Sequence, residues 1–282
     1  MDKGPADNAP IGVFDSGIGG LSVLRALCEE LPTHDFVYLA DSAHAPYGER
    51  DPGFVLARSQ AAVDYLRSKG VRALVVACNT ATAAAIDALR VQYPDMALIG
   101  VEPAIKPALA LSRTGHIGVL ATRGTLQSPR FEALMAPYAS KAKFTLVPCD
   151  GLALAIETGN DAEIRRLCEA AMADMGPVGA GAGEVDTLVL GCTHYPFAQA
   201  HLLALAGPDV TLIDNGPAVA RQTRVRLPVG VPGSQVSPLH ERMGQITLLA
   251  TGDATGLQAA AQRWLKRDLR AAELQLAGVG AD

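Results

Sequence analysis

Short apolar runs alternate along the chain with longer stretches in which apolar positions recur every three or four residues. The runs are rich in Val, Ile and Leu, which predicts buried strands, and the longer stretches predict amphipathic helices. Regular alternation of the two favours mostly parallel sheets that are covered by helices on both faces. The expected helices are Gly20–Glu30, Gly53–Lys69, Thr82–Arg90, Ser128–Tyr138, Asp161–Met175 and Phe197–Ala206.

Four strand-like segments recur in the same order in two parts of the chain, which predicts two homologous α/β halves. The matched pairs are Ile11–Ser16 with Ile117–Thr122, Phe36–Asp41 with Phe144–Cys149, Ala73–Thr80 with Thr187–His194, and Leu98–Ala104 with Leu212–Ala218. A further strand at Gln245–Ala250 and a helix at Leu257–Leu269 have no counterpart. We therefore expect two mostly parallel α/β domains, related by a pseudo-twofold axis, with the active site in the cleft between them.

Composition narrows the class of protein. A chain of 282 residues buries a sizeable core, and a net charge of −5 without long charged blocks argues against nucleic acid or an anionic membrane as partner. No apolar stretch reaches membrane-spanning length, and Met1–Ala9 lacks the apolar region of a signal peptide. Five cysteines at irregular spacing do not form a disulfide framework. A cytoplasmic protein with free thiols is expected.

Two cysteines, Cys78 and Cys192, occupy matched positions at the ends of strand-like runs. Inverting a carbon centre requires one group to remove a proton from one face and another to return a proton to the opposite face. Two thiols that face each other across a cleft supply both groups, at a separation of about 6 to 7 Å. This gap is too wide for a disulfide and suits a substrate carbon between the sulfurs. The pattern predicts a two-base proton transfer, in which helix N-termini stabilise the thiolates.

Polar residues near these cysteines are candidates for tuning the thiols and for binding substrate. Asp15 ends the first strand and His194 follows Cys192 by two positions, so each is placed to assist a thiol. Asp15 as a helix N-cap and His194 as a structural histidine are the alternatives. The predicted substrate-binding residues are Asp15, Ser16, Tyr47, Gly48, Asn79, Thr80, Thr193 and His194, with Tyr47 and Gly48 contributing backbone N–H groups.

Weaker expectations concern three residues. Tyr47 as ordinary cleft packing stays an alternative to its binding role. Cys149 is expected to pack in the core, and Glu157 to cap a helix or line the entrance of the cleft. No arginine or lysine lies in these motifs, so we expect hydroxyls and backbone amides, rather than an Arg clamp, to bind the substrate.

Four of these segments resemble the signature segments of the glutamate racemases, the cofactor-independent members of the aspartate/glutamate racemase superfamily. The four are Asp15–Gly20, Pro46–Gly48, Cys78–Ala81 and Gly191–Pro196. The resemblance implies interconversion of L- and D-glutamate without metal or cofactor, which supplies D-glutamate for bacterial peptidoglycan and so for the cell wall and cell shape.

The resemblance also implies roles and an organisation. Asp15 is expected to work with Cys78, which takes the proton from D-glutamate, and His194 with Cys192, which takes it from L-glutamate. The first domain is expected to comprise residues 1–98 and 210–282, and the second residues 99–209. The oligomeric state is left open, a homodimer being one alternative.

Other functions stay in view. An aspartate or hydantoin racemase would keep the two cysteines, but is not expected to combine the segments around Asp15 and Cys192. A non-enzymatic two-lobed amino-acid sensor and a zinc site of Cys78, Cys192 and His194 are further alternatives, although the latter lacks closely spaced ligand pairs and a fourth ligand. Pyridoxal phosphate is not expected, since no motif offers a lysine for the Schiff base.

Overall fold

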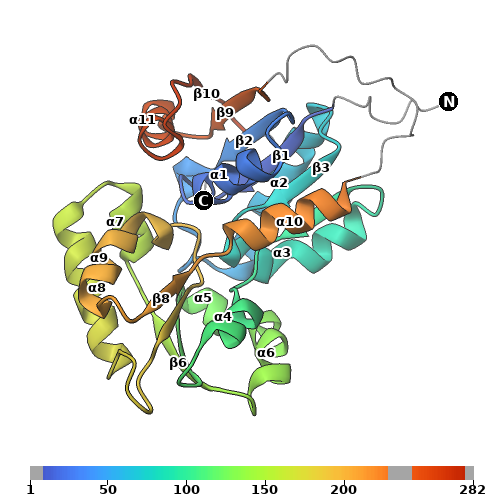
Figure 1. The fold of residues 1–282 in the computed structure, drawn as a ribbon. Coiled ribbons are helices and arrows are strands. Elements are labelled where there is room, and N and C mark those ends of the chain that lie inside the picture. Colours follow the sequence, from blue (N-terminus) through green and yellow to red (C-terminus); the bar gives the residue numbers. More distant parts are fainter. Residues whose placement is uncertain (1–8, 228–242, 277–282) are drawn as a thin grey trace.

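The computed structural model describes residues 9–227 and 243–276, which form two parallel sheets with helices on both faces of each. Figure 1 shows the two halves one above the other. The predicted fold class, two mostly parallel α/β units, is confirmed. Among the described residues, no helix combines the length and the apolar character needed to cross a membrane.

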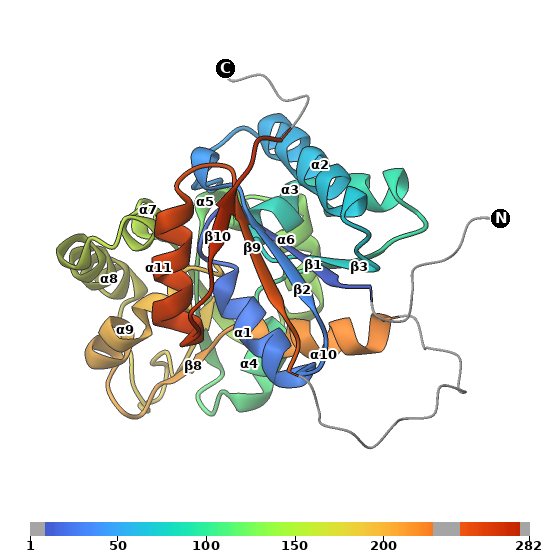
Figure 2. The ribbon, with the colours of Figure 1, turned by 90° about the horizontal axis from the view of Figure 1, so that it is seen from above.

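The first sheet has six parallel strands in the order β10-β9-β2-β1-β3-β4. Helices α1, α10 and α11 cover one face and α2 and α3 cover the other, as Figure 2 shows. The strands are β1 (Ile11–Asp15), β2 (Phe36–Ala40), β3 (Ala73–Val76), β4 (Ala97–Gly100), β9 (Ile246–Ala250) and β10 (Ala271–Glu273). The helices are α1 (Leu21–Glu30), α2 (Pro52–Ser68), α3 (Asn79–Gln92), α10 (Gly216–Arg226) and α11 (Ala254–Leu265), with the 3-10 turn η1 (Ser42–His44).

The second sheet has four parallel strands in the order β6-β5-β7-β8. Helices α7, α8 and α9 lie on one side and α4 and α6 on the other (Figure 1). The strands are β5 (His116–Ala121), β6 (Lys143–Pro148), β7 (Thr187–Leu190) and β8 (Thr211–Ile213). The helices are α4 (Ile105–Leu111), α5 (Arg123–Leu126), α6 (Pro129–Met135), α7 (Leu152–Glu157), α8 (Asp161–Met175) and α9 (Gln199–Ala206), with the 3-10 turns η2 (Ala136–Tyr138) and η3 (Tyr195–Ala198).

The internal repeat is visible in the strand order. The order β2-β1-β3-β4 of the first sheet corresponds element by element to β6-β5-β7-β8 of the second. Strands β9 and β10 extend only the first sheet, beside β2. The unmatched strand expected at Gln245–Ala250 is β9, whereas β10 was not expected from the sequence. In each sheet the order turns at the central strand, so the gap between β1 and β3, and that between β5 and β7, is where an open α/β sheet binds ligands.

The sheets divide the chain at slightly different points from the predicted domain boundaries. Strand β4 continues to Gly100 in the first sheet, across the boundary predicted at 98/99. Strand β8 lies in the second sheet, although the prediction assigns residues 210–282 to the first domain. The physical reason is the repeat itself, because β8 completes the edge of β7 as β4 completes the edge of β3. Whether these units are independent domains stays a prediction.

One apolar core runs through both halves. Its residues include Val13 and Val75 from the first sheet and Leu120 and Leu188 from the second, each buried. Smaller clusters lie on the remaining face of each sheet. Burying a side chain of this size stabilises the fold by about 1.5 to 3 kcal/mol. The shared core therefore holds the carboxyl ends of the two sheets against each other.

Candidate active site

The two predicted thiols lie directly after equivalent strands. Cys78 follows β3 and is the N-cap residue of α3, where its Sγ accepts a hydrogen bond from the backbone N–H of Ala81 at 3.4 Å. Cys192 follows β7 and Gly191. Cys78 is 5% exposed and Cys192 is 6% exposed. The negative charge of a Cys192 thiolate raises the pKa of Cys78. The structure thus brings both thiols to the junction of the halves.

Cys78 lies in a buried and negatively charged environment. Burial, and then the carboxylate of Asp15, raise the pKa of Cys78 to about 12. The Ala81 N–H and the hydroxyl of Ser16, 3.7 Å from Sγ, act in the opposite direction. A thiolate at Cys78 therefore needs a further positive charge nearby.

Asp15 lies at the end of β1 and is fully buried. Its Oδ1 accepts from the N–H of Gly17 at 2.8 Å, and its Oδ2 accepts from the hydroxyl of Thr193 at 3.2 Å. Burial raises the pKa of Asp15 to about 6, against the charge of His194 and the Gly17 N–H, which lower it. The Asp15 carboxyl of the first half is thus hydrogen-bonded to Thr193 of the second half, which directly follows Cys192.

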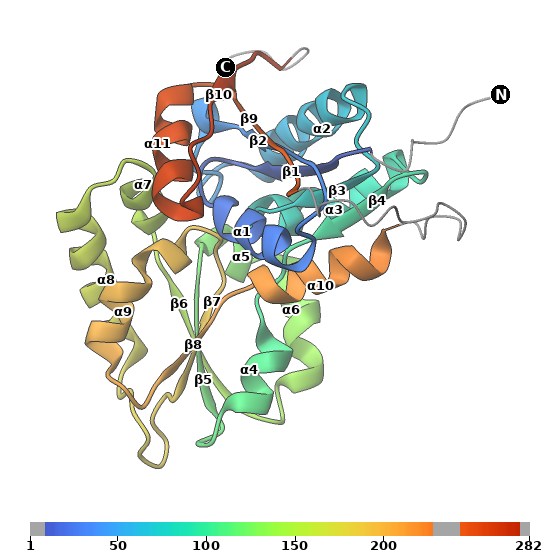
Figure 3. The same cartoon turned by 45° about the horizontal axis from the view of Figure 1, so that its top comes forward.

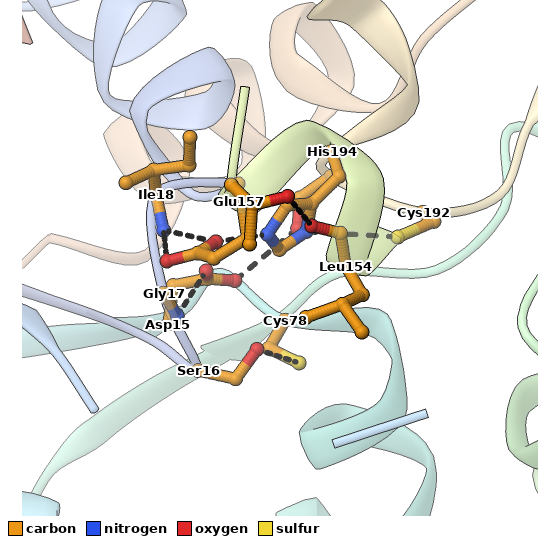
Figure 4. A network of polar contacts seen from close by, with 12 residues as sticks. Asp15, Ser16, Gly17, Ile18, Cys78, Leu154, Glu157, Cys192 and His194 are labelled. Carbon is orange, nitrogen blue, oxygen red and sulfur yellow. Dashed lines mark hydrogen bonds and ion pairs between the residues drawn. The ribbon is translucent and has the colours of Figure 1, made fainter. Parts of the chain in front are cut away.

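His194 lies between Cys192 and Glu157. Its Nδ1 is 3.8 Å from the Cys192 Sγ, and its Nε2 is 2.7 Å from a carboxylate oxygen of Glu157. Burial lowers the pKa of His194, but the hydrogen bonds to Cys192 and Glu157 outweigh it and raise the pKa well above its usual range. Figure 4 shows this chain of contacts, with Cys192 and Glu157 on opposite sides of the imidazole. A protonated imidazole in this place stabilises negative charge on the Cys192 sulfur.

Glu157 joins the two halves. It is the last residue of α7, in the second half, and its carboxylate accepts from the Ile18 N–H of the first half at 3.0 and 3.2 Å. The sequence reasoning expected Glu157 to cap a helix or line the entrance and assigned it no partner. Its contact with His194 is the main feature of the site that the sequence did not predict.

The glycines of the loop after β1 allow this close approach. A Cβ atom on Gly17 would lie 2.4 Å from the Glu157 carboxylate oxygens, and one on Gly19 would lie 2.2 Å from His194 Nδ1. Both distances are shorter than any real contact of such atoms. The glycine-rich segment is therefore required by the packing of one half against the other, as well as by the turn itself.

One predicted substrate-binding hydroxyl meets a hydroxyl of the other half across the junction. The Thr80 hydroxyl, in the first turn of α3, is 3.1 Å from the Thr122 hydroxyl at the start of α5. Thr122 is the repeat counterpart of Ser16, so the repeat could have identified it, although the sequence reasoning did not. Asn79 is 3% exposed and donates to the Val101 carbonyl at 3.5 Å.

Tyr47 is held by a buried ion pair. Its hydroxyl donates to Asp41 at 2.5 Å, and Asp41 also binds Arg58 through two hydrogen bonds of 2.6 and 2.8 Å. Despite burial, the bonds from Arg58, Thr251 and Tyr47 lower the pKa of Asp41. The Tyr47 side chain thus anchors its turn to the sheet. The role predicted for the backbone N–H groups of Tyr47 and Gly48 stays a prediction.

A groove between the halves leads to these residues. It encloses about 920 Å³ and is lined by Gly48, Thr80 and Gly124, and by the cationic side chains of Arg123 and Arg130. Arg123 is paired with Asp150, and Arg130 with Asp87 and Glu102. Two residues of its lining are bonded to each other, since Gly124 donates to the Gly48 carbonyl at 3.4 Å. The groove thus reaches the edge of the site, and hydrogen bonds between the halves close off the interior.

Cys149 lies next to the site in the core. It is 6% exposed, and Tyr195 donates to its backbone carbonyl at 3.2 Å. Burial raises the pKa of its thiol far above the usual range. This environment is that of a packed and inert cysteine. Among the described residues, no group of three or more His, Cys, Asp or Glu side chains is arranged to hold a metal ion.

The sequence is similar to that of known racemases over most of its length. The model of the Asp/Glu/hydantoin racemase family matches residues 11–223. A glutamate racemase of Pseudomonas syringae pv. tomato is 48% identical over 220 residues, which are 77% of this chain and 78% of that protein. A glutamate racemase of Pseudomonas paraeruginosa is 45% identical over 258 residues, which are 88% of this chain and 96% of that protein.

Solved structures agree with the sequence comparison. Glutamate racemase isoform RacE1 from Bacillus anthracis superposes with a TM-score of 0.82 at 29% identity, covering 96% of this chain and 99% of that one. Escherichia coli glutamate racemase, in complex with L-glutamate and the activator UDP-MurNAc-ala, superposes with a TM-score of 0.78 at 31% identity, covering 96% and 100%.

Proposed function

Because the chain belongs to the Asp/Glu/hydantoin racemase family and is a glutamate racemase, we propose that it interconverts L- and D-glutamate by a two-cysteine, cofactor-independent proton transfer. The observation that carries this proposal is the pair of buried thiols at equivalent strand ends, each with its own acid/base neighbours. We further propose that the product, D-glutamate, enters bacterial peptidoglycan, and that the reaction takes place in the cytoplasm, where thiols stay reduced.

The proposed reaction begins with one thiolate and one thiol. From D-glutamate, the Cys78 thiolate removes the Cα proton, and the electron pair of the C–H bond passes into the α-carboxylate as a planar carbanion. The Cys192 thiol then donates its proton to the opposite face. L-Glutamate leaves, with Cys78 as the thiol and Cys192 as the thiolate. The reverse reaction exchanges the two roles, so no net proton is gained or lost.

The charges of the site fit this sequence of events. Burial and Asp15 raise the pKa of Cys78 to about 12, so the thiolate is costly before substrate is bound. The ammonium group of glutamate brings a positive charge into the buried site and lowers that cost. On the other side, Glu157 stabilises the protonated form of His194, and the protonated His194 stabilises the charge of Cys192. The substrate itself is thus part of the activation of the Cys78 base.

The test is exchange of the Cα hydrogen in deuterium oxide, with purified protein and L- or D-glutamate as the only additions. We expect deuterium at Cα to appear together with the opposite enantiomer, and activity to survive dialysis against a chelator. Cys78→Ala and Cys192→Ala are each expected to abolish racemisation, because each variant lacks the acid or base for one face. Cys28→Ala is the matched control, because Cys28 is a partly buried thiol of α1. This variant is expected to racemise normally.

Other outcomes would contradict the proposal. Racemisation by either single-cysteine variant at the wild-type rate would exclude the two-base reaction. Dependence on added zinc would favour the metal alternative, and exchange only with aspartate or a hydantoin would assign another substrate of the same family. Binding of glutamate without exchange would favour a sensor.

A further inference from the structure

Asn215 lies where the chain returns from the second half to the first. It follows β8 of the second sheet and is the N-cap residue of α10, which packs along α1 of the first half. Figure 3 shows α10 beside α1 at the junction of the two halves. Asparagine commonly caps a helix with its side chain, but the Asn215 side chain makes no cap hydrogen bond. Asp214 accepts from the Gly216 N–H instead, at 2.8 Å.

The Asn215 side chain points inward and bonds to both thiol-bearing segments. It is 3% exposed. Its Nδ2 donates to the side-chain carbonyl of Asn79 at 3.4 Å and to the backbone carbonyl of Leu190 at 3.1 Å. Asn79 directly follows Cys78, and Leu190 is the last residue of β7, two positions before Cys192. Since both neighbours are acceptors, the amide nitrogen must face them, which fixes the orientation of the amide group.

The internal repeat shows that these hydrogen bonds join the two points at which the chain passes from one half to the other. The repeat matches Asn215 with Val101, the residue at which the chain leaves the first half after β4. The Val101 carbonyl accepts from Asn79 Nδ2. Val101 and Asn215, one at each of these points, are thus both hydrogen-bonded to the Asn79 side chain. The network runs from Val101 through Asn79 and Asn215 to Leu190.

We propose that Asn215 is a positioning residue that sets the separation of Cys78 and Cys192. Its amide donates one hydrogen bond to Asn79, directly after Cys78, and another to Leu190, two positions before Cys192. The inference rests on the proposed two-thiol function. A proton transfer depends steeply on geometry, and a displacement of about 1 Å costs about 10²-fold in rate. A change at Asn215 therefore acts on catalysis without touching the substrate.

The test compares Asn215→Ala and Asn215→Asp with the wild-type enzyme. Alanine removes both donor bonds, and aspartate keeps the shape but replaces the donor by an acceptor. We expect kcat to fall by about 10- to 100-fold in both directions and KM to change by less than about threefold. In deuterium oxide, the ratio of exchange without inversion to racemisation is expected to rise severalfold, because a misplaced second thiol lets the first return a solvent-derived deuteron to the same face.

Asn160→Ala is the matched control. Asn160 is exposed and caps α8 by accepting from the Glu163 N–H at 3.2 Å. Its loss is expected to lower the melting temperature and to leave kcat and the exchange ratio unchanged. A merely structural role of Asn215 would give this same pattern.

The proposal is overturned if Asn215→Asp or Asn215→Ala folds and keeps kcat and the exchange ratio within about threefold of wild type. It is also overturned if neither variant regains the wild-type far-ultraviolet circular dichroism spectrum, since Asn215 would then act in folding. Failure of the proposed function is a separate result, because it appears in the wild-type enzyme or in the single-cysteine variants.

Discussion

At the scale of single residues, the two thiols have chemically different surroundings although they occupy equivalent positions. Cys78 lies near Asp15, a carboxyl in a fully buried place, whereas Cys192 lies beside His194. The repeat counterpart of Asp15 is Ala121, so the second half has no carboxyl there. The repeat therefore places the two sulfurs in equivalent positions. The different side chains beside them give each sulfur its own means of gaining and losing a proton.

Asp15→Asn is expected to stabilise the protein at pH 7.5. Burial raises the pKa of Asp15 to about 6, so the folded protein holds this proton more tightly than the unfolded chain does. Stability is therefore lost as the pH rises from about 4 to about 6, by at most about 3 kcal/mol. Asparagine carries no charge and can bond to Gly17 and Thr193. Melting curves should show a gain at pH 7.5 that vanishes at pH 4; a loss at pH 7.5 would contradict the assignment.

The same variant is expected to slow the reaction unequally in the two directions. If Asp15 assists Cys78, kcat from D-glutamate should fall more than kcat from L-glutamate. The equilibrium constant between free enantiomers is unity, so the ratio of KM values must change to match. His194→Asn should give the opposite preference. Equal losses of kcat in both directions for both variants would show that these residues hold the site together without serving one thiol each.

At the scale of elements, the loop between β1 and α1 is shaped by the other half of the molecule. Gly17 and Gly19 approach Glu157 and His194 so closely that a methyl group on either has no space. The loop also donates the Ile18 N–H to Glu157. A segment that reads as a simple glycine turn is thus the surface against which the His194–Glu157 pair is fixed.

Gly19→Ala is expected to reduce kcat by about 10²-fold, with the larger loss from L-glutamate, because the new methyl displaces His194 from Cys192. Gly53→Ala is the control, since Gly53 is exposed in the first turn of α2 and alanine favours a helix. Steady-state kinetics from both enantiomers decide the matter. A Gly19→Ala enzyme with wild-type kinetics would mean that the loop yields more easily than the contacts indicate.

The sequence predicted the positions of Cys78 and Cys192 because a repeated apolar run ending in a thiol is a local pattern. Short helices were missed: α5 has only four residues, and α7 is mostly apolar, so periodicity does not reveal them. The partners of Glu157 and Asn215 were missed for a different reason. Each lies at a helix end, where a local role is the usual one, and only the packing of the two halves turns its side chain inward.

At the scale of the whole molecule, the site exists only while the halves are together. Asp15, His194 and both thiols are at most 6% exposed, so glutamate reaches them only when the halves separate. One contact between the halves is the stack between Phe197 of η3 and Trp264 of α11, whose ring centroids are 4.4 Å apart. The oligomeric state concerns a different level of organisation and stays open, with a homodimer as one alternative.

Trp264 is expected to report this movement, because it is the one tryptophan in the sequence. A ligand that binds the closed state more tightly increases the population in which the rings are stacked, and we expect glutamate to act in this way. We expect its addition to change the Trp264 emission, with half-saturation near KM. Phe197→Leu keeps the bulk without the ring and should lose most of this change while it still binds glutamate. An emission of the wild type that does not respond to glutamate would place the opening elsewhere.

The position of the second half inside the first has a consequence for synthesis of the protein. A ribosome completes β1 to β4, then the whole second sheet, and only afterwards β9, which pairs with β2. Until that strand emerges, the nascent chain carries an open β2 edge, the kind of edge that pairs with other chains. Folding of the first half therefore requires a contact of more than 200 residues in sequence separation, as between Phe36 and Ile246. Such late closure makes the interval before residue 246 a stage at which the nascent chain is prone to aggregate.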